Sequence, residues 1–384
     1  MAIEKAPRDV VVVSLEAWDN VWRRNQHLVD GLLGHDPDMR VLFVEPPRDS
    51  LHDLLTGRGF SRGRGARVHA GHDGRLVLFQ PTKLLPRVVG GASDRLWRRQ
   101  VLREISRLGM RRPLVWVNDA QGAEIVRSRD WPALYDITDD WLLARRPARA
   151  LRRFARNEKI LFERCREVVV CSAALATSRG AQRKVRLIPN AVDVARYRHP
   201  APHPPDLPAG VALYAGTLHE DRLDVDLVAR CAKHLAAEGD VVLVGPDALS
   251  ATSRATLISA GVLLLGPRPH TEIPAYLQHA DVLIVPHLVD SFTDSLDPIK
   301  LYEYRAVGRP VVSTAVAGFR DSAAPAVVVA TADEFPTVVL SAIRKPGATV
   351  RDADVPDWSA RVADMVAVLE AAWAADASRH ASGR

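Results

Sequence analysis

Residues 281–314, DVLIVPHLVDSFTDSLDPIKLYEYRAVGRPVVST, decide the fold, because two strand-like runs enclose one helical segment there. The runs DVLIVP and RPVVST are nearly continuous in Val, Leu and Ile, which is typical of parallel strands covered on both faces. A helix is predicted to start near Pro298, since a proline in the first turn loses no hydrogen bond. Lys300 and Glu303 are three residues apart and share one face of that turn. The stretch therefore predicts a strand–helix–strand unit with two charged side chains at the edge of a sheet.

The same alternation of apolar runs and helical segments extends over the whole chain. One series of runs lies before residues 196–210, RYRHPAPHPPDLPAG, and a second lies after them. This proline-rich stretch reads as a linker, so the sequence predicts two α/β domains with parallel sheets. The runs begin at Asp9, Arg40, Arg75, Pro113, Ala133, Glu167 and Val185 in the first series and at Val211, Asp240, Gly261, Asp281, Arg309 and Ala326 in the second.

The composition is that of an ordinary globular protein. The chain has 384 residues, of which 47% are hydrophobic and 26% charged, and this length suits two domains. The first apolar run is flanked by Asp9 and Glu16, so it lacks the pattern of a signal peptide, and no run approaches the roughly 20 residues of a membrane-spanning helix. Cys165, Cys171 and Cys231 show no paired spacing, which favours a reducing compartment. We expect a cytoplasmic protein.

The net charge of +6 suits an anionic partner, such as a nucleotide, a nucleic acid or an acidic lipid surface. Residues 144–166 combine many arginines with Leu151, Phe154 and Ile160. A basic amphipathic helix of this kind can lie on an anionic membrane, so a peripheral contact through these residues is one interpretation. The alternative is a solvated helix that packs through its apolar residues.

Several sequence patterns of cofactor and metal sites are missing. No H-E-x-x-H or Cys/His cluster occurs, and neither does a G-x-G-x-x-G or a Walker A motif, which argues against a metal, NAD or ATP. Residues 49–74 are rich in Gly, Arg and His and predict a mobile loop.

In open parallel sheets, ligands bind beyond the carboxyl ends of the strands, near the positive ends of helices. In the second domain, Lys300 at such a position can neutralise a pyrophosphate, and Glu303 can accept hydrogen bonds from two ribose hydroxyls. An ion pair between the two side chains is the alternative. Further candidates follow the strands that begin at Val211 and Gly261: Gly216, Thr217, Arg222, Arg268 and His270. For Arg222 the alternative is an exposed arginine at a helix start.

The first domain offers carboxylates beyond its strands. Asp139 and Asp140 follow the run from Ala133, and neighbouring carboxylates can raise each other's pKa toward that of a general base. A helix cap is the alternative for Asp139. Asn118 and Asp119 follow the run from Pro113, where Asp119 fits a helix cap or a ligand of the acceptor. His27, in the first turns of a helix, fits an acceptor or phosphate contact or a satisfied, partly buried histidine.

The segments VVVSLEAW, DITDDW, VVVCSAALA, VRLIPNAVD, AGTL, LLLG and PIKLYEYRAVGRPVVST occur here in a characteristic order. In this order and spacing the chain resembles the nucleotide-sugar-dependent glycosyltransferases of the GT-B fold, a group with family 4 enzymes, teichuronic-acid-type transferases and the glucuronosyltransferases of xanthan assembly. The resemblance implies an α/β protein whose two Rossmann-like, doubly wound domains face each other across a cleft. Residues 1–200 would form the acceptor-side domain, residues 201–356 the donor domain, and a helix within 357–384 would pack back on the first domain.

The resemblance implies a metal-independent transfer of a sugar from a nucleoside-diphosphate sugar (UDP, GDP or dTDP) to an acceptor hydroxyl, with no other cofactor. Glu303 matches the second glutamate of the family's E-x7-E motif, which holds the ribose, and Lys300 matches a lysine on the donor phosphates. Arg222 falls where the family places a basic side chain. Ser295 stands where the first glutamate is expected, so inversion and retention both stay open. Asp139 aligns with the aspartate proposed as the base of the inverting xanthan-type enzymes.

The expected partners are the nucleotide-sugar donor and a small-molecule or lipid-linked acceptor, without nucleic acid. The context implied is bacterial cell-envelope glycan or natural-product biosynthesis, in the cytoplasm or at the inner face of the membrane. Two other functions stay open: a sugar-nucleotide epimerase of the same fold, and a catalytically silent partner of another transferase.

Overall fold

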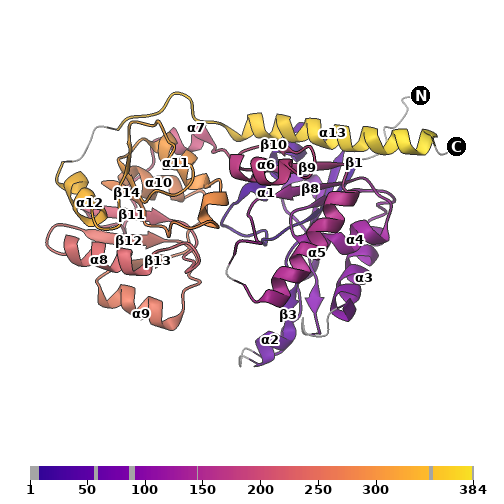
Figure 1. Cartoon of the computed structure of the whole chain (residues 1–384), viewed down its shortest axis with the longest axis horizontal. Coiled ribbons are helices and arrows are strands. Elements are labelled where there is room, and N and C mark those ends of the chain that lie inside the picture. The colour runs from indigo at the N-terminus through magenta and orange to yellow at the C-terminus, as the bar shows by residue number, and fades with distance from the viewer. Residues whose placement is uncertain (1–7, 56–58, 86–90, 145, 346–348, 383–384) are drawn as a thin grey trace.

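Two sheets, one from each half of the chain, lie next to each other in the computed structural model (Figure 1). The structure describes residues 8–55, 59–85, 91–144, 146–345 and 349–382. Each apolar run expected from the sequence forms a strand, although the strands are shorter than the runs. The polar or glycine residues that end each run lie in the loops beyond the strands, and these loops build the site.

The first sheet has eight strands in the order β10-β9-β8-β7-β1-β2-β5-β4. All neighbours pair in parallel except β4, which is antiparallel to β5. The chain order reverses between β1 and β7, and ligands of doubly wound sheets bind at such a switch point. The strands are β1 (Arg8–Val13), β2 (Met39–Val44), β4 (Gly65–Val68), β5 (Leu76–Gln80), β7 (Leu114–Val117), β8 (Ala133–Ile137), β9 (Glu167–Val170) and β10 (Arg186–Leu187).

Helices cover both faces of this sheet, which explains why its strands are apolar on both sides. One apolar core joins one face to α3 (Gly91–Arg107), α4 (Ala123–Ser128), α5 (Ala148–Arg164) and α6 (Ala173–Gly180). The core on the other face joins the sheet to α1 (Arg24–His35) and α13 (Trp358–Ser382). Gly31 permits the close approach of these two helices, because a β-carbon there would overlap the Val362 side chain.

The second sheet has six parallel strands in the order β13-β12-β11-β14-β15-β16, and its switch point lies between β11 and β14. The strands are β11 (Val211–Ala215), β12 (Asp240–Val244), β13 (Leu263–Gly266), β14 (Val282–Val285), β15 (Val311–Ser313) and β16 (Val327–Val329). One face packs on α8 (Val225–Leu235), α9 (Ala251–Ser259) and α12 (Phe335–Arg344). The other packs on α7 (Val194–Arg198), α10 (Ile273–His279) and α11 (Ile299–Val307).

The chain crosses between the two sheets twice. The first crossing precedes α7, which already packs on the second sheet, and the expected linker after α7 contains no helix or strand in residues 199–210. The return crossing precedes α13, where Val192 forms a parallel bridge with Asp357 and its N–H donates to the Pro356 carbonyl (3.1 Å). The last helix thus returns to the first sheet, as Figure 1 shows.

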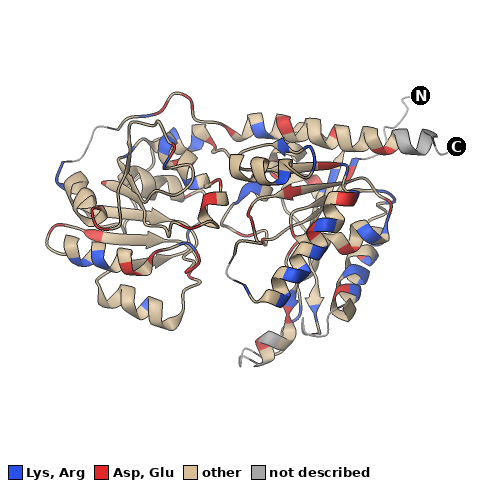
Figure 2. Ribbon diagram, viewed as in Figure 1, with Lys and Arg blue, Asp and Glu red and all other residues tan. Residues whose placement is uncertain are grey.

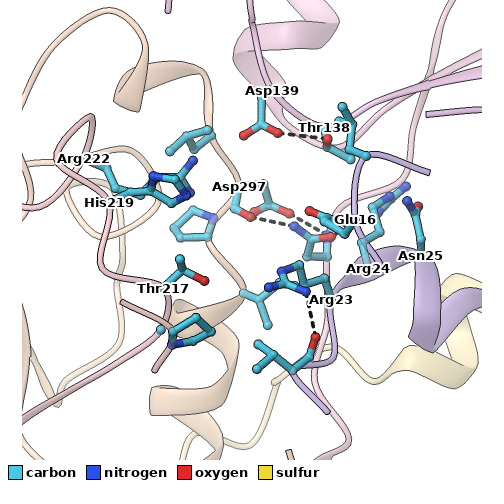
Figure 3. A pocket seen from close by; sticks show the side chains of 18 of the residues that line it. Glu16, Arg23, Arg24, Asn25, Thr138, Asp139, Thr217, His219, Arg222 and Asp297 are labelled. Carbon is cyan, nitrogen blue, oxygen red and sulfur yellow. Dashed lines mark hydrogen bonds between the residues drawn. The ribbon is translucent and has the colours of Figure 1, made fainter. Parts of the chain in front are cut away.

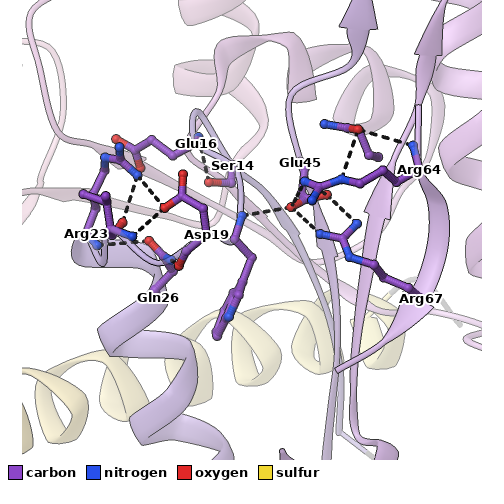
Figure 4. A network of polar contacts seen from close by, with 11 residues as sticks. Ser14, Glu16, Asp19, Arg23, Gln26, Glu45, Arg64 and Arg67 are labelled. Carbon is purple, nitrogen blue, oxygen red and sulfur yellow. Dashed lines mark hydrogen bonds and ion pairs between the residues drawn. The ribbon is translucent and has the colours of Figure 1, made fainter. Parts of the chain in front are cut away.

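The segment 49–74, expected to form a mobile loop, contains α2 (Ser50–Leu55) and β4, while residues 56–58 lie outside the described part. Two arginines fix β4 to the first sheet, since Arg64 and Arg67 both pair with the buried carboxylate of Glu45 (3.2 and 2.8 Å; Figure 4). Glu45 also accepts the N–H of Trp18 (2.9 Å), in the loop that follows β1. Secondary structure and ion pairs therefore occupy much of this segment. Two short strands, β3 (Arg48–Asp49) and β6 (Thr82–Lys83), pair beside it.

Most of the basic stretch 144–166 forms α5 (Ala148–Arg164), and residue 145 lies outside the described residues. Its apolar side chains Phe154, Ile160 and Leu161 pack into the core, while arginines stay exposed (Figure 2). The amphipathic pattern is thus satisfied by packing within the protein. Among the described helices, none combines the length and the apolar character that a bilayer crossing demands.

Candidate active site

A cavity of about 820 Å³ lies where the carboxyl ends of the two sheets face each other. This volume falls in the range typical of small-molecule sites. Its wall contains side chains from both halves of the chain, and Figure 3 shows some of them at close range. The wall includes these candidates from the sequence: His27, Asp119, Asp139, Gly216, Thr217, Arg222, Arg268, His270, Lys300 and Glu303.

Lys300 lies in the first turn of α11, as expected, and its Nζ lies 4.7 Å from the centroid of the Tyr214 ring. Within the described residues the ammonium has no hydrogen-bond or ion-pair partner, so the alternative of a Lys300–Glu303 ion pair is not what the structure contains. Gly216 leaves the space that the ammonium occupies, because a β-carbon at this position would overlap it. An unpaired cation at a helix N-terminus is suited to bind a phosphate.

Glu303 lies one turn further along the same helix. Its carboxylate accepts a hydrogen bond from the Tyr197 hydroxyl (2.5 Å), which comes from α7. Burial raises the pKa of Glu303, while the Tyr197 hydrogen bond and the charge of Lys300 act in the opposite direction. One carboxylate oxygen is held by Tyr197, and the group still lines the cavity, where it can accept hydroxyl donors.

Arg222 follows β11 and points toward the cavity next to His219 (Figure 3). Its Cζ lies 5.8 Å from the Phe292 ring centroid, and its buried Nε has no hydrogen-bond acceptor in the described part of the chain. Among the described residues its one ion pair, to Asp221, is long (3.5 Å). Arg222 therefore keeps capacity to bind an anion.

Arg268 lines the cavity but has protein partners. It pairs with Asp206 (2.6 Å) and its Nε donates to the Tyr276 hydroxyl (2.9 Å). These contacts hold the loop after β13 in place, so a side-chain role for Arg268 toward a ligand would compete with them.

Aromatic rings join the two halves beside the cavity. Trp22 stacks on His270 at 4.2 Å, and the His270 N–H donates to the Asn20 carbonyl (2.8 Å). His27 stacks on Trp358 at 4.7 Å. Burial lowers the pKa of His27 to about 3 and that of His270 to about 4, so both rings are neutral at pH 7. The two histidines thus pack as neutral aromatic rings. This favours the interpretation of His27 as a partly buried histidine whose partners lie within the protein.

Asp139 faces the cavity beyond β8 and accepts a hydrogen bond from its neighbour Thr138 (3.0 Å). It does not cap a helix in this structure. Burial raises its pKa, and the charge of Arg222 opposes the rise. Asp119, beyond β7, lines the cavity and caps a short helical turn by accepting the N–H of Gln121 (2.8 Å).

Three candidates from the sequence lie outside the cavity wall, each in buried contacts. Asp140 pairs with Arg179 (2.8 Å), and the Ser295 hydroxyl donates to the Phe292 carbonyl (2.7 Å). Asn118 donates to the Asp136 carbonyl (3.1 Å) and accepts from the N–H of Leu15 (3.2 Å) and the side chain of Asn25 (2.7 Å). These three residues were expected to contact ligands. Instead their buried polar groups form hydrogen bonds and ion pairs within the protein, as buried polar groups generally do.

Asp294 and Asp297 lie near Ser295, where the first glutamate of the E-x7-E motif is expected. Neither of them presents a carboxylate to the cavity without other partners. Asp294 pairs with Arg320 on the surface (2.9 Å) and does not line the cavity. Asp297 does line it, but its carboxylate accepts the N–H of Asn190 (2.5 Å) and the Tyr302 hydroxyl (2.7 Å). Asp297 therefore joins the two halves of the chain. Within the described residues, no group of three or more His, Cys, Asp and Glu side chains is arranged to hold a metal ion.

The sequence reasoning missed Glu16, Tyr197 and His287. Glu16 and His287 lie in the loops that follow β1 and β14, the strands at the two switch points, so the rule that selected the other loops also pointed at them. His287 is buried, and its Nε2 lies 3.1 Å from the Tyr214 hydroxyl. For Tyr197, which lies in a helix before the linker, the sequence contained no such signal.

Parts of this chain resemble known proteins in sequence. Residues 209–366 match the family described as Glycosyl transferases group 1. A stretch of 73 residues is 34% identical to TuaH of Bacillus subtilis (strain 168), described as a teichuronic acid biosynthesis glycosyltransferase. This match spans 18% of this chain and 18% of that protein.

Solved structures resemble the chain over nearly its full length. HepE of Anabaena, in complex with UDP and glucose, has a TM-score of 0.62 at 13% identity and covers 98% of this chain and 100% of its own. TarM of S. aureus, in a complex that includes UDP, has a TM-score of 0.60 at 8% identity, covering 96% and 99%. AviGT4, a glycosyltransferase involved in avilamycin A biosynthesis, has a TM-score of 0.51 at 15% identity, covering 98% and 99%. The chain has the GT-B fold, and its second sheet lies within the residues that match the group 1 glycosyl transferase model, so the resemblance expected from the sequence is confirmed.

Proposed function

We propose that this protein transfers a glycosyl group from a nucleoside-diphosphate sugar to an acceptor hydroxyl. The observation that carries the proposal is the unpaired ammonium of Lys300 in the cavity, at the N-terminus of α11 and beside the bare backbone of Gly216. The match to group 1 glycosyl transferases and the UDP complexes of HepE and TarM support it.

The roles follow from charge and position. Lys300 and Arg222 stabilise the negative charge that develops on the leaving diphosphate, and Glu303 accepts hydrogen bonds from the ribose. Stabilisation that grows as the bond to the leaving group breaks accelerates the reaction, whereas equal binding of donor and transition state does not. Because cationic side chains and a helix N-terminus supply this stabilisation, the proposed reaction needs no metal or other cofactor.

The acceptor side of the cavity is formed by the first half of the chain. Its wall there contains Asp139, Trp141 and side chains of α5, among them Arg149 and Phe154. A mixture of arginines and apolar groups fits an acceptor that is a small polar molecule or the head of a lipid. We propose an acceptor of this kind for a bacterial glycan or natural product.

The function is tested by incubating the protein with UDP-, GDP- or dTDP-glucose and glycerol, a generic hydroxyl acceptor, and by measuring glucosyl glycerol. We expect a product with one nucleotide in preference to the others. Conversion of the donor sugar in the absence of any acceptor would instead identify an epimerase. If no nucleotide binds and none is consumed, the protein is a silent partner of another transferase.

We further propose that the exposed arginines of α5 contact an anionic membrane surface. The contact is electrostatic, because the apolar residues of the helix are packed inside the protein. It is tested by sedimentation with phosphatidylglycerol vesicles at low and high salt. Reversal of Arg152 and Arg156 to Glu should abolish binding, while reversal of Arg230 and Lys233 on α8 should not. Equal sedimentation of both double variants would contradict the proposal.

A further inference from the structure

The loop that follows β1 places a carboxylate in the cavity that has no partner. The backbone of Glu16 is anchored, because its N–H donates to the Ser14 hydroxyl (3.1 Å) and the preceding N–H of Leu15 donates to Asn118 (3.2 Å). Its side chain lines the cavity. Among the described residues, nothing forms a hydrogen bond or ion pair with the Glu16 carboxylate. A fixed backbone with a free carboxylate is the geometry of a group that acts on a ligand.

Four charged side chains face Glu16. Arg23 and Arg222 attract its negative charge, while Asp139 and Asp19 repel it. Burial is the largest effect, and together these raise the pKa of Glu16 to about 7. A carboxylate with a pKa near the working pH is a stronger base than an ordinary glutamate, and about half of it is ionised at that pH.

Glu16 and Asp139 come from the ends of two strands of the first sheet, and both lie across the cavity from Arg222 (Figure 3). The two carboxylates differ in their hydrogen bonds, since Asp139 already accepts one from the Thr138 hydroxyl. Arg222 belongs to the side of the cavity that is proposed to hold the diphosphate. An acceptor hydroxyl placed between Glu16 and the donor sugar would therefore have the base on one side and the leaving group on the other.

We propose that Glu16 is the catalytic residue that removes the proton from the acceptor hydroxyl, and that Asp139 is a positioning residue whose charge keeps Glu16 basic. This inference rests on the proposed function. The acceptor oxygen forms the new bond to C1 of the sugar, and the bond from C1 to the diphosphate oxygen breaks. The electron pair leaves with the nucleoside diphosphate, and the proton passes to the Glu16 carboxylate and then to water. Attack from the face opposite the leaving group inverts the configuration at C1.

The test compares Glu16→Gln, Glu16→Asp and Asp139→Asn with the wild type, using the nucleoside-diphosphate glucose that the wild type accepts and glycerol. General base catalysis contributes about 10²- to 10⁴-fold, so we expect Glu16→Gln to lower kcat by that factor. Glu16→Asp should retain more activity. The rise in Tm caused by the free nucleoside diphosphate should persist in all variants, which shows that they fold and bind.

The pH profile separates the roles of the two carboxylates. Wild-type kcat should rise with pH through about 7, because Glu16 must be ionised to act. Asp139→Asn removes a repelling charge, which lowers the pKa of Glu16 and moves this rise to lower pH. A merely structural role of Asp139 would lower activity without moving the rise.

The outcomes distinguish this inference from the proposed function. If the wild type transfers glucose and Glu16→Gln transfers it at a similar rate, the inference alone is overturned, and the leaving phosphate takes the proton. An unshifted pH profile in Asp139→Asn overturns the role of Asp139. If the wild type transfers no sugar at all, the proposed function fails, and this inference fails with it.

Discussion

The ammonium of Lys300 lies over the ring of Tyr214, 4.7 Å from its centroid, and the hydroxyl of the same tyrosine lies 3.1 Å from His287 Nε2. A cation–π contact holds the ammonium in place without neutralising it. Burial and the charges of Lys300 and Arg222 keep the pKa of His287 well below its usual range, so the imidazole stays neutral. Among Lys300, Tyr214 and His287, the positive charge therefore remains on Lys300, where it can bind a phosphate.

Lys300→Ala should weaken binding of the nucleoside diphosphate about 10- to 100-fold, since a charge-assisted contact contributes about 1.5 to 3 kcal/mol. The measurement is isothermal titration with UDP, GDP and dTDP. Lys233→Ala, an exposed lysine on α8 of the same sheet, is the matched control and should bind like the wild type. Equal affinities of the wild type and Lys300→Ala would remove Lys300 from the donor site.

Gly216→Ala should displace the Lys300 ammonium, because the new methyl group would overlap it. The backbone at Gly216 has φ +145°, so the substitution also costs about 1 to 2 kcal/mol of strain. Gly261→Ala separates the two effects, since Gly261 has φ +87° and no neighbouring atom within 4 Å of the added carbon. Both variants should lose stability in urea, but only Gly216→Ala should lose nucleotide affinity. Loss of affinity in both would point to a general effect of strain.

Glu303→Gln should lower the affinity for a ribonucleoside diphosphate about tenfold, because the amide accepts hydroxyl donors less well than the carboxylate. The affinity for the 2′,3′-dideoxy analogue should change little, since the lost contact is to the ribose hydroxyls. Competition between the two nucleotides for wild type and variant measures this difference. An equal loss of affinity for both nucleotides would indicate that Glu303 supports the structure of the helix and does not bind the ribose.

Asp136→Ala should destabilise the fold by about 3 to 5 kcal/mol, because it leaves the buried guanidinium of Arg24 without its partner at 3.2 Å. Urea unfolding measures the loss. Asp364→Ala removes the exposed partner of Arg361 on α13 and should cost at most about 1 kcal/mol, because the carboxylate of this pair lies in solvent. A cost of less than about 1 kcal/mol at Asp136 would contradict the structural role of the buried pair.

Local patterns predict those parts of the fold that depend on short stretches of sequence. Apolar runs located the strands, and Pro298 located the start of α11 to within one residue. The rule that ligands lie beyond the carboxyl ends of strands located Lys300 and Asp139 at the cavity. The division of the chain near residue 200 stays a prediction, as do the roles of the individual site residues.

Partners far apart in sequence decide the rest. Asp139 and Asp140 are neighbours, yet one faces the cavity and the other pairs with Arg179. The sequence around these two residues does not distinguish them, because the arginine that pairs with Asp140 comes from a different helix. The pKa of Glu16 also depends on residues that are distant in the sequence. It is set by burial and by charges on other loops, including Arg222 in the second half of the chain.

The return of α13 to the first sheet affects how the chain can fold while it is being made. Val362, Met365 and Leu369 are among the α13 residues that complete a core, and the buried members of this core outside α13 lie between Val10 and Ala191. Until the ribosome has added these last residues, one apolar face of the first sheet lacks part of its cover, even after the second sheet has been synthesised. The nascent chain would thus expose an apolar surface until α13 has been synthesised and has packed over it.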